Sequence, residues 1–458
     1  MKSAILTIVI CFLIFEVNAQ SASRVRKPAR LQVSADKRNL VHQDGSPFFW
    51  LADTGWELFH RLDSNDVNQY LSKRAAQGFT LIQAVALAEL DGLHTPNRYG
   101  ATPLENDDPL RPKEEYFRYV DWVIDRAASY GMYIGLLPTW GDKLFKNRWG
   151  AGPEIFNEIN ARQYGKWIGD RYKDKTNIVW ILGGDRLPRN DTDVNVWRAM
   201  AAGVIEGVGN KDKALLTYHP QPSATSSSSP WFHNDDWLDF NMLQTGHCRD
   251  IKVWELIQKD YNLKPVKPTL NGEPIYEDHP VCFNAKELGY TNSYDIRKAA
   301  YLSVFAGSAG FTYGCHAVWQ FHTPPQPGVN GPLKSWQASL DLPAASQMKH
   351  LKNFMSNYGK SARPAEEILT DTLDGTKRIQ AMRTNNHILV YSAGGEPFSL
   401  QPQQVNLKKS TRGFWYNPRA GTKQKLDQNT ILQNKFTPPS NGEGNDWVLL
   451  LSEQGFKD

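Results

Sequence analysis

Strand-like and helix-like segments alternate from about residue 45 to about residue 345, and this alternation restricts the fold more than any other feature. Short apolar runs alternate with longer segments of helical periodicity, and glycines such as Gly78 and Gly131 end helices. The predicted strands cover residues 47–52, 80–87, 132–138, 177–182, 214–218, 240–244, 268–270 and 311–319. The predicted helices comprise one capped by Ser64 and others over residues 114–130, 161–172, 194–208, 251–259, 294–305 and 336–355.

This order of elements implies parallel β-structure. About eight strand-then-helix units in about 300 residues fit an α/β fold closed into a (β/α)8 TIM barrel. An open, doubly wound sheet is the competing architecture. It lacks support because no Gly-x-Gly-x-x-Gly turn follows the first strand.

The pattern changes after about residue 361. Residues 388–391, 414–416 and 447–451 are short strand-like runs, and Gly394-Gly395, Asn417-Pro418 and Asn441-Gly442 separate them as turns. We therefore predict a barrel domain over residues 20–361 and a small all-β sandwich domain over residues 362–458, packed closely together.

The first 19 residues have the features of a secretory signal peptide. Lys2 is followed by an apolar stretch over residues 4–15, which is too short to span a bilayer, and Val17-Asn18-Ala19 offers a cleavage site before Gln20. A buried N-terminal strand is the alternative. No cysteine follows the cleavage site to carry a lipid, and no later apolar run approaches a membrane span. We expect a secreted protein, periplasmic or extracellular.

The composition excludes some partners. The formal net charge is +4, and basic and acidic residues are mixed along the chain without a basic stripe, so a nucleic-acid partner is not expected. Cys248, Cys282 and Cys315 are too few for a disulfide framework, which leaves either free thiols or one bridge plus one thiol. The 15 tryptophans are unusually many and can serve as flat apolar surfaces.

Polar and aromatic residues gather at the ends of the predicted strands. The active site of a TIM barrel forms at the carboxyl ends of its strands. Carboxylates for chemistry, amides and imidazoles for hydroxyl groups, and indoles for flat ring faces suit a sugar substrate. The candidate residues are Asp53, Trp56, Gln83, Trp140, Asp185, His219, Gln244, His247, Glu273, His316 and Trp319.

Two of these acids form a plausible catalytic pair. Asp185 ends the fourth strand after two glycines, and Glu273 ends the seventh strand. Glycosidic hydrolysis needs two carboxyl groups, which in a retaining enzyme lie about 5–5.5 Å apart. We assign Glu273 as the nucleophile, ionised through neighbouring donors, and Asp185 as the general acid/base with a raised pKa.

Structural roles compete with these assignments. An acid after a strand is often a helix N-cap, and Arg186 could pair with Asp185. The three histidines could be core or surface residues, and Trp149 and Trp231, in loops, are weaker candidates for outer sugar subsites. The acids of Glu89-Asp91 and Glu277-Asp278 are interpreted as solvated loop charges.

Three motifs resemble glycoside hydrolase family 140, the apiosidase-like barrels. They are the segment from Phe48 to Glu57, Trp180-Ile181-Leu182-Gly183-Gly184-Asp185, and Asn271-Gly272-Glu273-Pro274. The tail, with its segment from Trp415 to Gly421, is similar to the β-domain that accompanies that barrel and is labelled collagen-binding, although no cationic or aromatic face supports that label. The resemblance covers nearly all of the mature chain. It implies a retaining enzyme that cleaves the bond to apiose in rhamnogalacturonan II, a pectin, with Asp185 and Glu273 in the roles above.

Two other function classes remain open. A metal-dependent hydrolase could use Asp53, Asp185, His219 and His247 as ligands, but no His-x-His or His-Glu-x-x-His spacing supports it. A non-catalytic carbohydrate-binding protein is the other alternative. For the glycosidase we expect a polysaccharide or oligosaccharide partner and neither a cofactor nor a metal.

Overall fold

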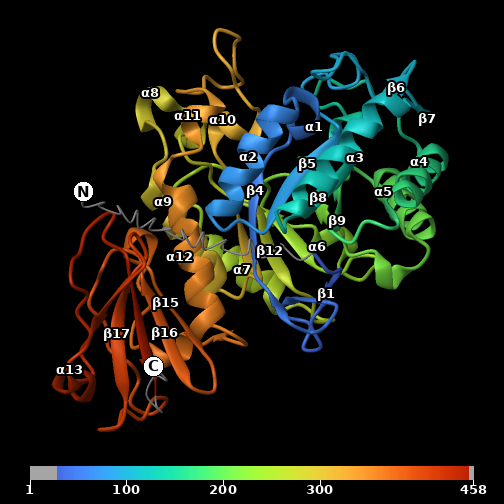
Figure 1. Cartoon of the computed structure of the whole chain (residues 1–458). Coiled ribbons are helices and arrows are strands. Elements are labelled where there is room, and N and C mark those ends of the chain that lie inside the picture. Colours follow the sequence, from blue (N-terminus) through green and yellow to red (C-terminus); the bar gives the residue numbers. More distant parts are fainter. Residues whose placement is uncertain (1–27, 453–458) are drawn as a thin grey trace, which may run out of the picture.

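The computed structural model describes residues 28–452 (Figure 1), so the predicted signal peptide lies outside the described residues. The described chain begins with a three-stranded antiparallel sheet, formed by β1 (Leu31–Val33), β2 (Leu40–His42) and β3 (Pro47–Phe48). Its apolar side chains belong to the same buried cluster as Trp50 and Tyr133, the first residues of two barrel strands. The small sheet therefore closes the amino-terminal end of the barrel.

The barrel is an eight-stranded parallel sheet in the order β10-β9-β8-β5-β4-β13-β12-β11. Between the two outer strands of this order, the Asp239 amide donates to the Leu216 carbonyl over 2.9 Å and the Thr217 hydroxyl donates to the Phe240 carbonyl over 2.7 Å, which nearly closes the ring. The predicted TIM barrel is confirmed. Its strands are β4 (Trp50–Thr54), β5 (Leu81–Leu87), β8 (Tyr133–Thr139), β9 (Ile178–Gly183), β10 (Leu216–His219), β11 (Asn241–Gln244), β12 (Thr269–Glu273) and β13 (Gly310–Tyr313).

Helices surround the barrel. The longer ones are α2 (Ser64–Ala76), α3 (Glu114–Ser129), α4 (Glu158–Tyr172), α5 (Asp191–Val208), α7 (Val253–Tyr261), α9 (Ser293–Phe305) and α12 (Pro343–Tyr358). Shorter elements in the loops are α1 (Leu58–Arg61), α6 (Ser229–Phe232), α8 (Ala285–Leu288), α10 (His316–Trp319), α11 (Trp336–Ser339), β6 (Leu104–Glu105), β7 (Asp108–Pro112), and 3-10 turns at Gly141–Lys143, Lys211–Lys213 and Val281–Phe283. Among the described residues, no helix is both long and apolar enough to cross a bilayer.

Several element boundaries differ from the sequence-based prediction, and three of the differences bear on the argument. Asp63, not Ser64, caps α2, because its carboxylate accepts from the amides of Asn65 and Asp66. The strand predicted over 311–319 ends at Tyr313, and residues 316–319 form α10 instead. The strand predicted over 268–270 extends to Glu273, which places that carboxylate on the last strand residue.

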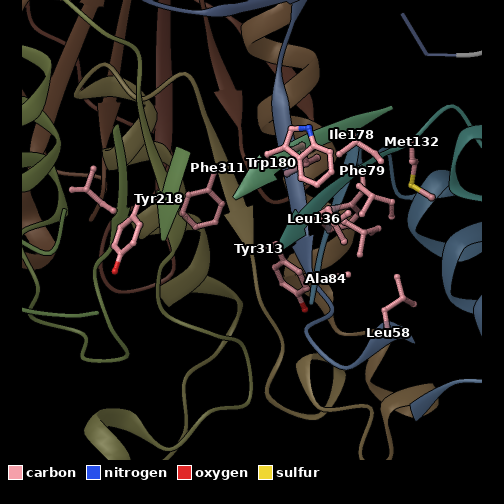
Figure 2. Packing of buried hydrophobic residues seen from close by; sticks show 14 of the residues in the cluster. Leu58, Phe79, Ala84, Met132, Leu136, Ile178, Trp180, Tyr218, Phe311 and Tyr313 are labelled. Atoms are coloured by element: carbon pink, nitrogen blue, oxygen red, sulfur yellow. The ribbon is translucent and has the colours of Figure 1, made fainter. Parts of the chain in front are cut away.

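Alternate residues of each strand supply two separate cores. In β9, Val179 and Ile181 face the barrel interior, whereas Trp180 and Leu182 face the helices. Figure 2 shows part of the outer layer, with Leu136, Trp180 and Phe311 among the labelled side chains. Because both faces of the sheet are buried, the strand ends are where the barrel exposes polar side chains that could act on a ligand.

The tail is an antiparallel sheet in the order β14-β15-β16-β19-β17-β18, which confirms the predicted all-β domain. Tyr391, Tyr416 and Leu450 pack with the barrel core, while the alternate residues Val390 and Leu449 face a core within the tail. Its elements are β14 (Arg363–Pro364), β15 (Ile379–Arg383), β16 (His387–Ser392), β17 (Arg412–Asn417), β18 (Thr422–Lys425), β19 (Trp447–Ser452), the short α13 (Gln428–Gln433) and 3-10 turns at Glu366–Ile368 and Gly375–Lys377.

An ion pair and an aromatic stack connect the tail to α9. Arg297 forms a buried ion pair with Asp446 at 2.7 Å, and Tyr301 stacks on Tyr391 with ring centroids 4.9 Å apart. Figure 1 shows the tail lying against α9 and α12. One face of the tail sheet is therefore used for packing against the barrel.

Candidate active site

A cavity of about 640 Å³ opens at the carboxyl ends of the barrel strands. Asp185 and Glu273 both line it, so the structure brings the predicted acid pair into one site. Five further predicted residues also line it: Trp56, Trp140, Gln244, His247 and Trp319. The lining also includes residues that sequence reasoning missed or ranked low, namely Glu89, Trp149, Tyr276, His279 and Phe283.

Glu273 is nearly buried and surrounded by donors. The Tyr276 hydroxyl donates to its Oε1 over 2.7 Å, and His247 Nε2 lies 3.7 Å from the same oxygen. His219 Nε2 lies 3.0 Å from Oε2, in a geometry outside that of a hydrogen bond. Burial raises the pKa of the Glu273 carboxyl, but these neighbours outweigh burial and hold the pKa below its ordinary value. Glu273 is thus kept as a carboxylate.

The backbone before Asp185 needs its glycines. Gly183 and Gly184 have φ angles of 85° and 116°, and Asp185 itself has a φ of 51°. A Cβ atom at Gly183 would lie 2.4 Å from the His219 carbonyl oxygen, and one at Gly184 would lie 2.7 Å from the Trp140 ring. The chain therefore turns sharply against two neighbouring strand ends, which directs Asp185 into the cavity.

The Asp185 carboxyl has the opposite electrostatic setting to Glu273. Trp149 Nε1 donates to its Oδ2 over 2.7 Å, and Arg186 Nη1 lies 3.3 Å from the same oxygen. Burial and the negative charge of Glu273 outweigh these partners and raise the pKa of Asp185 to about 6. In weakly acidic solution Asp185 keeps a proton while Glu273 is ionised, which is the division that an acid and a nucleophile require.

His219 connects the two acids. Its Nδ1 accepts a hydrogen bond from the Asp185 backbone amide over 3.3 Å, so the ring proton of a neutral His219 resides on Nε2, which faces Glu273. The ring is fully buried and packs edge-on against Trp56 with centroids 5.3 Å apart. His219 therefore lies beneath Glu273 and does not line the cavity itself.

The surroundings of Asp185 decide between its two alternative structural roles, as a helix N-cap and as an ion-pair partner of Arg186. The helix after β9 begins at Asp191 and is capped by Asn190, so Asp185 is not an N-cap. Arg186 does pair with Asp185, but its other N–H groups donate to the carbonyls of Phe145 and Lys146. Arg186 thereby fixes the loop that holds Trp149 against the Asp185 carboxyl group.

Besides Glu273 Oε2, three polar atoms of the cavity wall have no hydrogen-bond partner within the described residues. They belong to side chains that are more than nine-tenths buried: Trp140 Nε1, Gln244 Oε1 and His247 Nδ1. Buried polar atoms are normally paired, so these are available to a ligand. Trp149 and Phe283 are 52% and 63% exposed and supply apolar surface at the rim.

Besides His219, three predicted substrate-binding residues do not line the cavity. Asp53 is fully buried, and its Oδ2 accepts from Arg74 Nε over 2.6 Å and from the Tyr70 hydroxyl over 2.7 Å. Gln83 donates to the Gly272 carbonyl inside the barrel over 2.9 Å. His316 is buried beneath the surface, with Nε2 3.3 Å from the Asn330 carbonyl oxygen. Their strand-end positions led to the prediction, but their side chains are enclosed by protein.

Of the acids interpreted as solvated loop charges, Glu277 is buried and Glu89 is partly exposed in the wall of the cavity. Glu277 is 1% exposed and accepts hydrogen bonds from the Tyr313 hydroxyl and the Ala344 amide. Burial raises its pKa to about 7. Glu89 lines the catalytic cavity. Sequence position alone could not distinguish these acids from exposed ones, because both follow strands in loops rich in polar residues.

Cys248 and Cys282 form a disulfide, and Cys315 is a buried free thiol, which selects the alternative of one bridge plus one thiol. The bridge joins the loop after β11, which carries His247, to the loop after β12. Within residues 28–452, the single group with metal-ligand spacing is Cys248, Asp250 and Cys282, and its two cysteines are bonded to each other. The four ligands of the metal-dependent alternative do not converge.

Comparisons with known proteins agree with this geometry. Residues 34–360 match the family model described as "Apiosidase-like, catalytic domain", and residues 364–452 match "Putative collagen-binding domain of a collagenase". A solved structure described as a glycoside hydrolase is 31% identical, with a TM-score of 0.83, covering 94% of this chain and 98% of its own. A glycoside hydrolase family 5 structure from Bacteroides vulgatus is also 31% identical, with a TM-score of 0.82, covering 93% of this chain and 92% of its own. Curated protein sequences include no match.

Proposed function

Because the chain belongs to the apiosidase-like family of glycoside hydrolases, we propose that it hydrolyses pectin side chains with Glu273 as nucleophile and Asp185 as general acid/base. The observation that carries the assignment of roles is the opposite electrostatic setting of two carboxyl groups in one cavity. The proposed bond is the apiosidic linkage of rhamnogalacturonan II, and the proposed classification is family 140.

The mechanism proceeds in two displacements with retention. Asp185 donates its proton to the glycosidic oxygen while a Glu273 oxygen attacks the anomeric carbon, which breaks the glycosidic bond and forms a glycosyl–enzyme ester. Asp185, now a carboxylate, takes a proton from water as that water attacks the same carbon. The ester to Glu273 breaks, the sugar leaves, and both side chains return to their starting protonation states.

The charge of the cavity supports a neutral glycone. Within the described chain, the lining residues include three glutamate or aspartate side chains and neither lysine nor arginine. A uronic acid in this place would bring a further carboxylate towards Asp185 and Glu273 without a cation to pair with it. Apiose is uncharged and meets this condition. The predicted signal peptide supports export to the periplasm or the medium, where pectin fragments are accessible.

The experiment that tests the proposal is product analysis with rhamnogalacturonan II oligosaccharides. The wild-type enzyme is expected to release apiose with retained anomeric configuration. NMR of the first-formed product measures that configuration. Glu273→Gln should release none, whereas Glu115→Gln, a matched change at an exposed glutamate on α3, should release it at the wild-type rate.

Each other outcome has a defined meaning. An inverted product would reject Glu273 as nucleophile. Release of a different sugar would retain the two roles and replace the substrate. Binding of oligosaccharides without turnover by the wild-type protein would favour a non-catalytic carbohydrate-binding protein and overturn the proposed function.

A further inference from the structure

A third carboxyl group lies in the catalytic cavity without a protein partner. Glu89 follows the end of β5 by two residues and lines the cavity together with Asp185 and Glu273. Among residues 28–452, no side chain or amide forms a hydrogen bond or ion pair with its carboxyl group, and its neighbour Leu90 continues the same wall. Glu89 therefore neither caps a helix nor holds a loop in place through its side chain.

The groups around Glu89 are acidic. Burial first, and then the negative charges of Glu57, Asp185, Asp142 and Glu273, raise the pKa of the Glu89 carboxyl well above its ordinary value. Ionisation of a carboxyl in this setting is disfavoured, and in its protonated form the group can donate a hydrogen bond.

Lys143 and His60 are paired with Asp142 and Glu57. Lys143 is fully buried and lies 2.7 Å from Asp142. His60 Nδ1 lies 2.6 Å from Glu57, and the same ring bonds the Thr95 carbonyl through Nε2. These pairings leave Glu89 facing the cavity without a cation that would favour its ionised form.

The opposite wall presents complementary polar atoms. Counted from β4, β5 is the second strand and β11 the sixth of the eight-stranded barrel, so their ends face each other across the mouth. Gln244 ends β11, and its buried Oε1 has no protein partner. His247 Nδ1 on the same side is also unpartnered and buried. A sugar ring in the cavity thus meets polar atoms on two opposite sides.

We propose that Glu89 is a substrate-binding residue of the glycosidase, which donates a hydrogen bond from a neutral carboxyl group to a hydroxyl of an uncharged glycone held against Gln244. The inference rests on the proposed function and narrows it, because it makes the neutrality of the sugar a requirement of the site. A glycone carboxylate would face Glu89, Asp185 and Glu273 together.

The kinetic test compares Glu89→Gln with Glu89→Ala on the substrate that the wild-type enzyme cleaves. The amide of glutamine can still donate, so Glu89→Gln should keep KM within about threefold, whereas Glu89→Ala should raise KM about tenfold through the lost hydrogen bond. Glu115→Gln is the exposed control. Equal losses in both variants would show that the negative charge is needed and overturn the proposal, as would an unchanged KM in Glu89→Ala.

Two readouts that need no turnover separate this inference from the proposed function. Infrared difference spectra of wild type minus Glu89→Gln at pH 7 should contain the band of a protonated carboxyl group, and a carboxylate band instead would overturn the inference. Calorimetry in the Glu273→Gln background should measure binding of a panel of neutral sugars, apiose included, with galacturonic acid as the charged comparison. Binding of another neutral sugar in place of apiose would reject the proposed substrate but still report the contact with Glu89, whereas preference for galacturonic acid would overturn the inference.

Discussion

Asp53 and Asp185 occupy equivalent places in the barrel and have opposite surroundings. Each lies at the carboxyl end of a buried parallel strand, Asp53 in β4 and Asp185 after β9. Asp53 is enclosed by Arg74 and the Tyr70 hydroxyl, and its side chain has no exposed surface. Asp185 retains 18% exposure of its side chain, towards a cavity that also contains Glu273.

The difference shows that the position at a strand end does not decide the role of an acid. A carboxylate matched by a buried guanidinium contributes to the architecture, because its charge is neutralised within the protein. A carboxyl group that burial and a second acid disfavour as an anion keeps a proton that it can transfer. Replacing each acid by its amide should therefore separate catalysis from stability.

The largest expected effect is that of Asp185→Asn on catalysis. Asparagine cannot protonate the leaving oxygen, so kcat/KM on the natural substrate should fall by about 10²–10⁴-fold. Stability should be unchanged or higher, because one of two neighbouring buried acids becomes neutral. Steady-state kinetics and thermal melting measure the two effects.

A leaving-group series provides the control for this variant. A glycoside with a good leaving group needs no proton from Asp185, so Asp185→Asn should lose much less activity on a nitrophenyl glycoside than on the natural linkage. A loss of equal size on both substrates would contradict the role of Asp185 as general acid.

Asp53→Asn should have the converse effect. The change leaves Arg74 buried without its counter-charge, which is expected to lower the free energy of unfolding by about 3–5 kcal/mol. The kcat of the protein that remains folded should stay within about threefold of wild type, because Asp53 does not line the cavity. Denaturant unfolding and activity per folded molecule test this expectation. Lost activity at unchanged stability would show that Asp53 contributes to substrate binding or catalysis.

The sequence allowed the barrel, the all-β tail and the positions of Asp185 and Glu273 at strand ends to be predicted, because each depends on a local pattern. Buried strands are continuous apolar runs, and the residue that follows such a run lies at the barrel rim. The glycines before Asp185 also gave a local signal, since a backbone that passes close to its neighbours requires them.

Partners from distant segments could not be predicted in this way. Nothing in the sequence indicated that Arg74, on α2, would pair with Asp53 at the end of β4. The burial of Glu277 and the position of Glu89 in the cavity wall likewise depend on segments distant in sequence. Tyr276, three residues after Glu273, was the one missed contact with a short-range signal, because a hydroxyl so close in sequence can reach that carboxylate.

Glu277 adds a third case to the comparison of Asp53 and Asp185. Its pKa is raised, as that of Asp185 is, but its side chain is enclosed by protein, as that of Asp53 is. It accepts from the Tyr313 hydroxyl over 2.7 Å, and the Arg74 guanidinium lies 5.3 Å from the Tyr313 ring. Burial raises the pKa of Glu277 to about 7 from an ordinary value of 4.5. The folded state therefore binds this proton more tightly, and its contribution to stability is present below about pH 4.5 and lost as the pH rises towards 7.

Glu277→Gln should remove that loss, because glutamine is neutral at every pH. Relative to wild type, the variant should gain stability between pH 5 and pH 8, by an amount on the order of 1 kcal/mol per unit of pKa shift. Denaturant unfolding at a series of pH values measures the gain. A difference between the two proteins that does not change with pH would show that Glu277 is ionised throughout.

The smallest expected effect concerns Trp149. Its indole donates a hydrogen bond to the Asp185 carboxyl group, as Arg74 and Tyr70 do to that of Asp53. Asp185 must be protonated and Glu273 ionised, so kcat/KM should fall as the pH rises through about 6 and also as it falls below the lowered pKa of Glu273. The indole N–H of Trp149 stabilises the Asp185 carboxylate and opposes the raised pKa.

Trp149→Phe keeps an aromatic ring and removes this donor, so the alkaline limb should move upward by less than about one pH unit while the acid limb stays in place. Trp231→Phe, at a tryptophan of α6 that does not line the cavity, is the control and should move neither limb. Because Trp149 is 52% exposed, its replacement should leave the fold intact, so a shift can be assigned to the single hydrogen bond. An alkaline limb that moves downward would show that the indole favours the protonated acid, and the contrast between a matched Asp53 and an unmatched Asp185 would then need another cause.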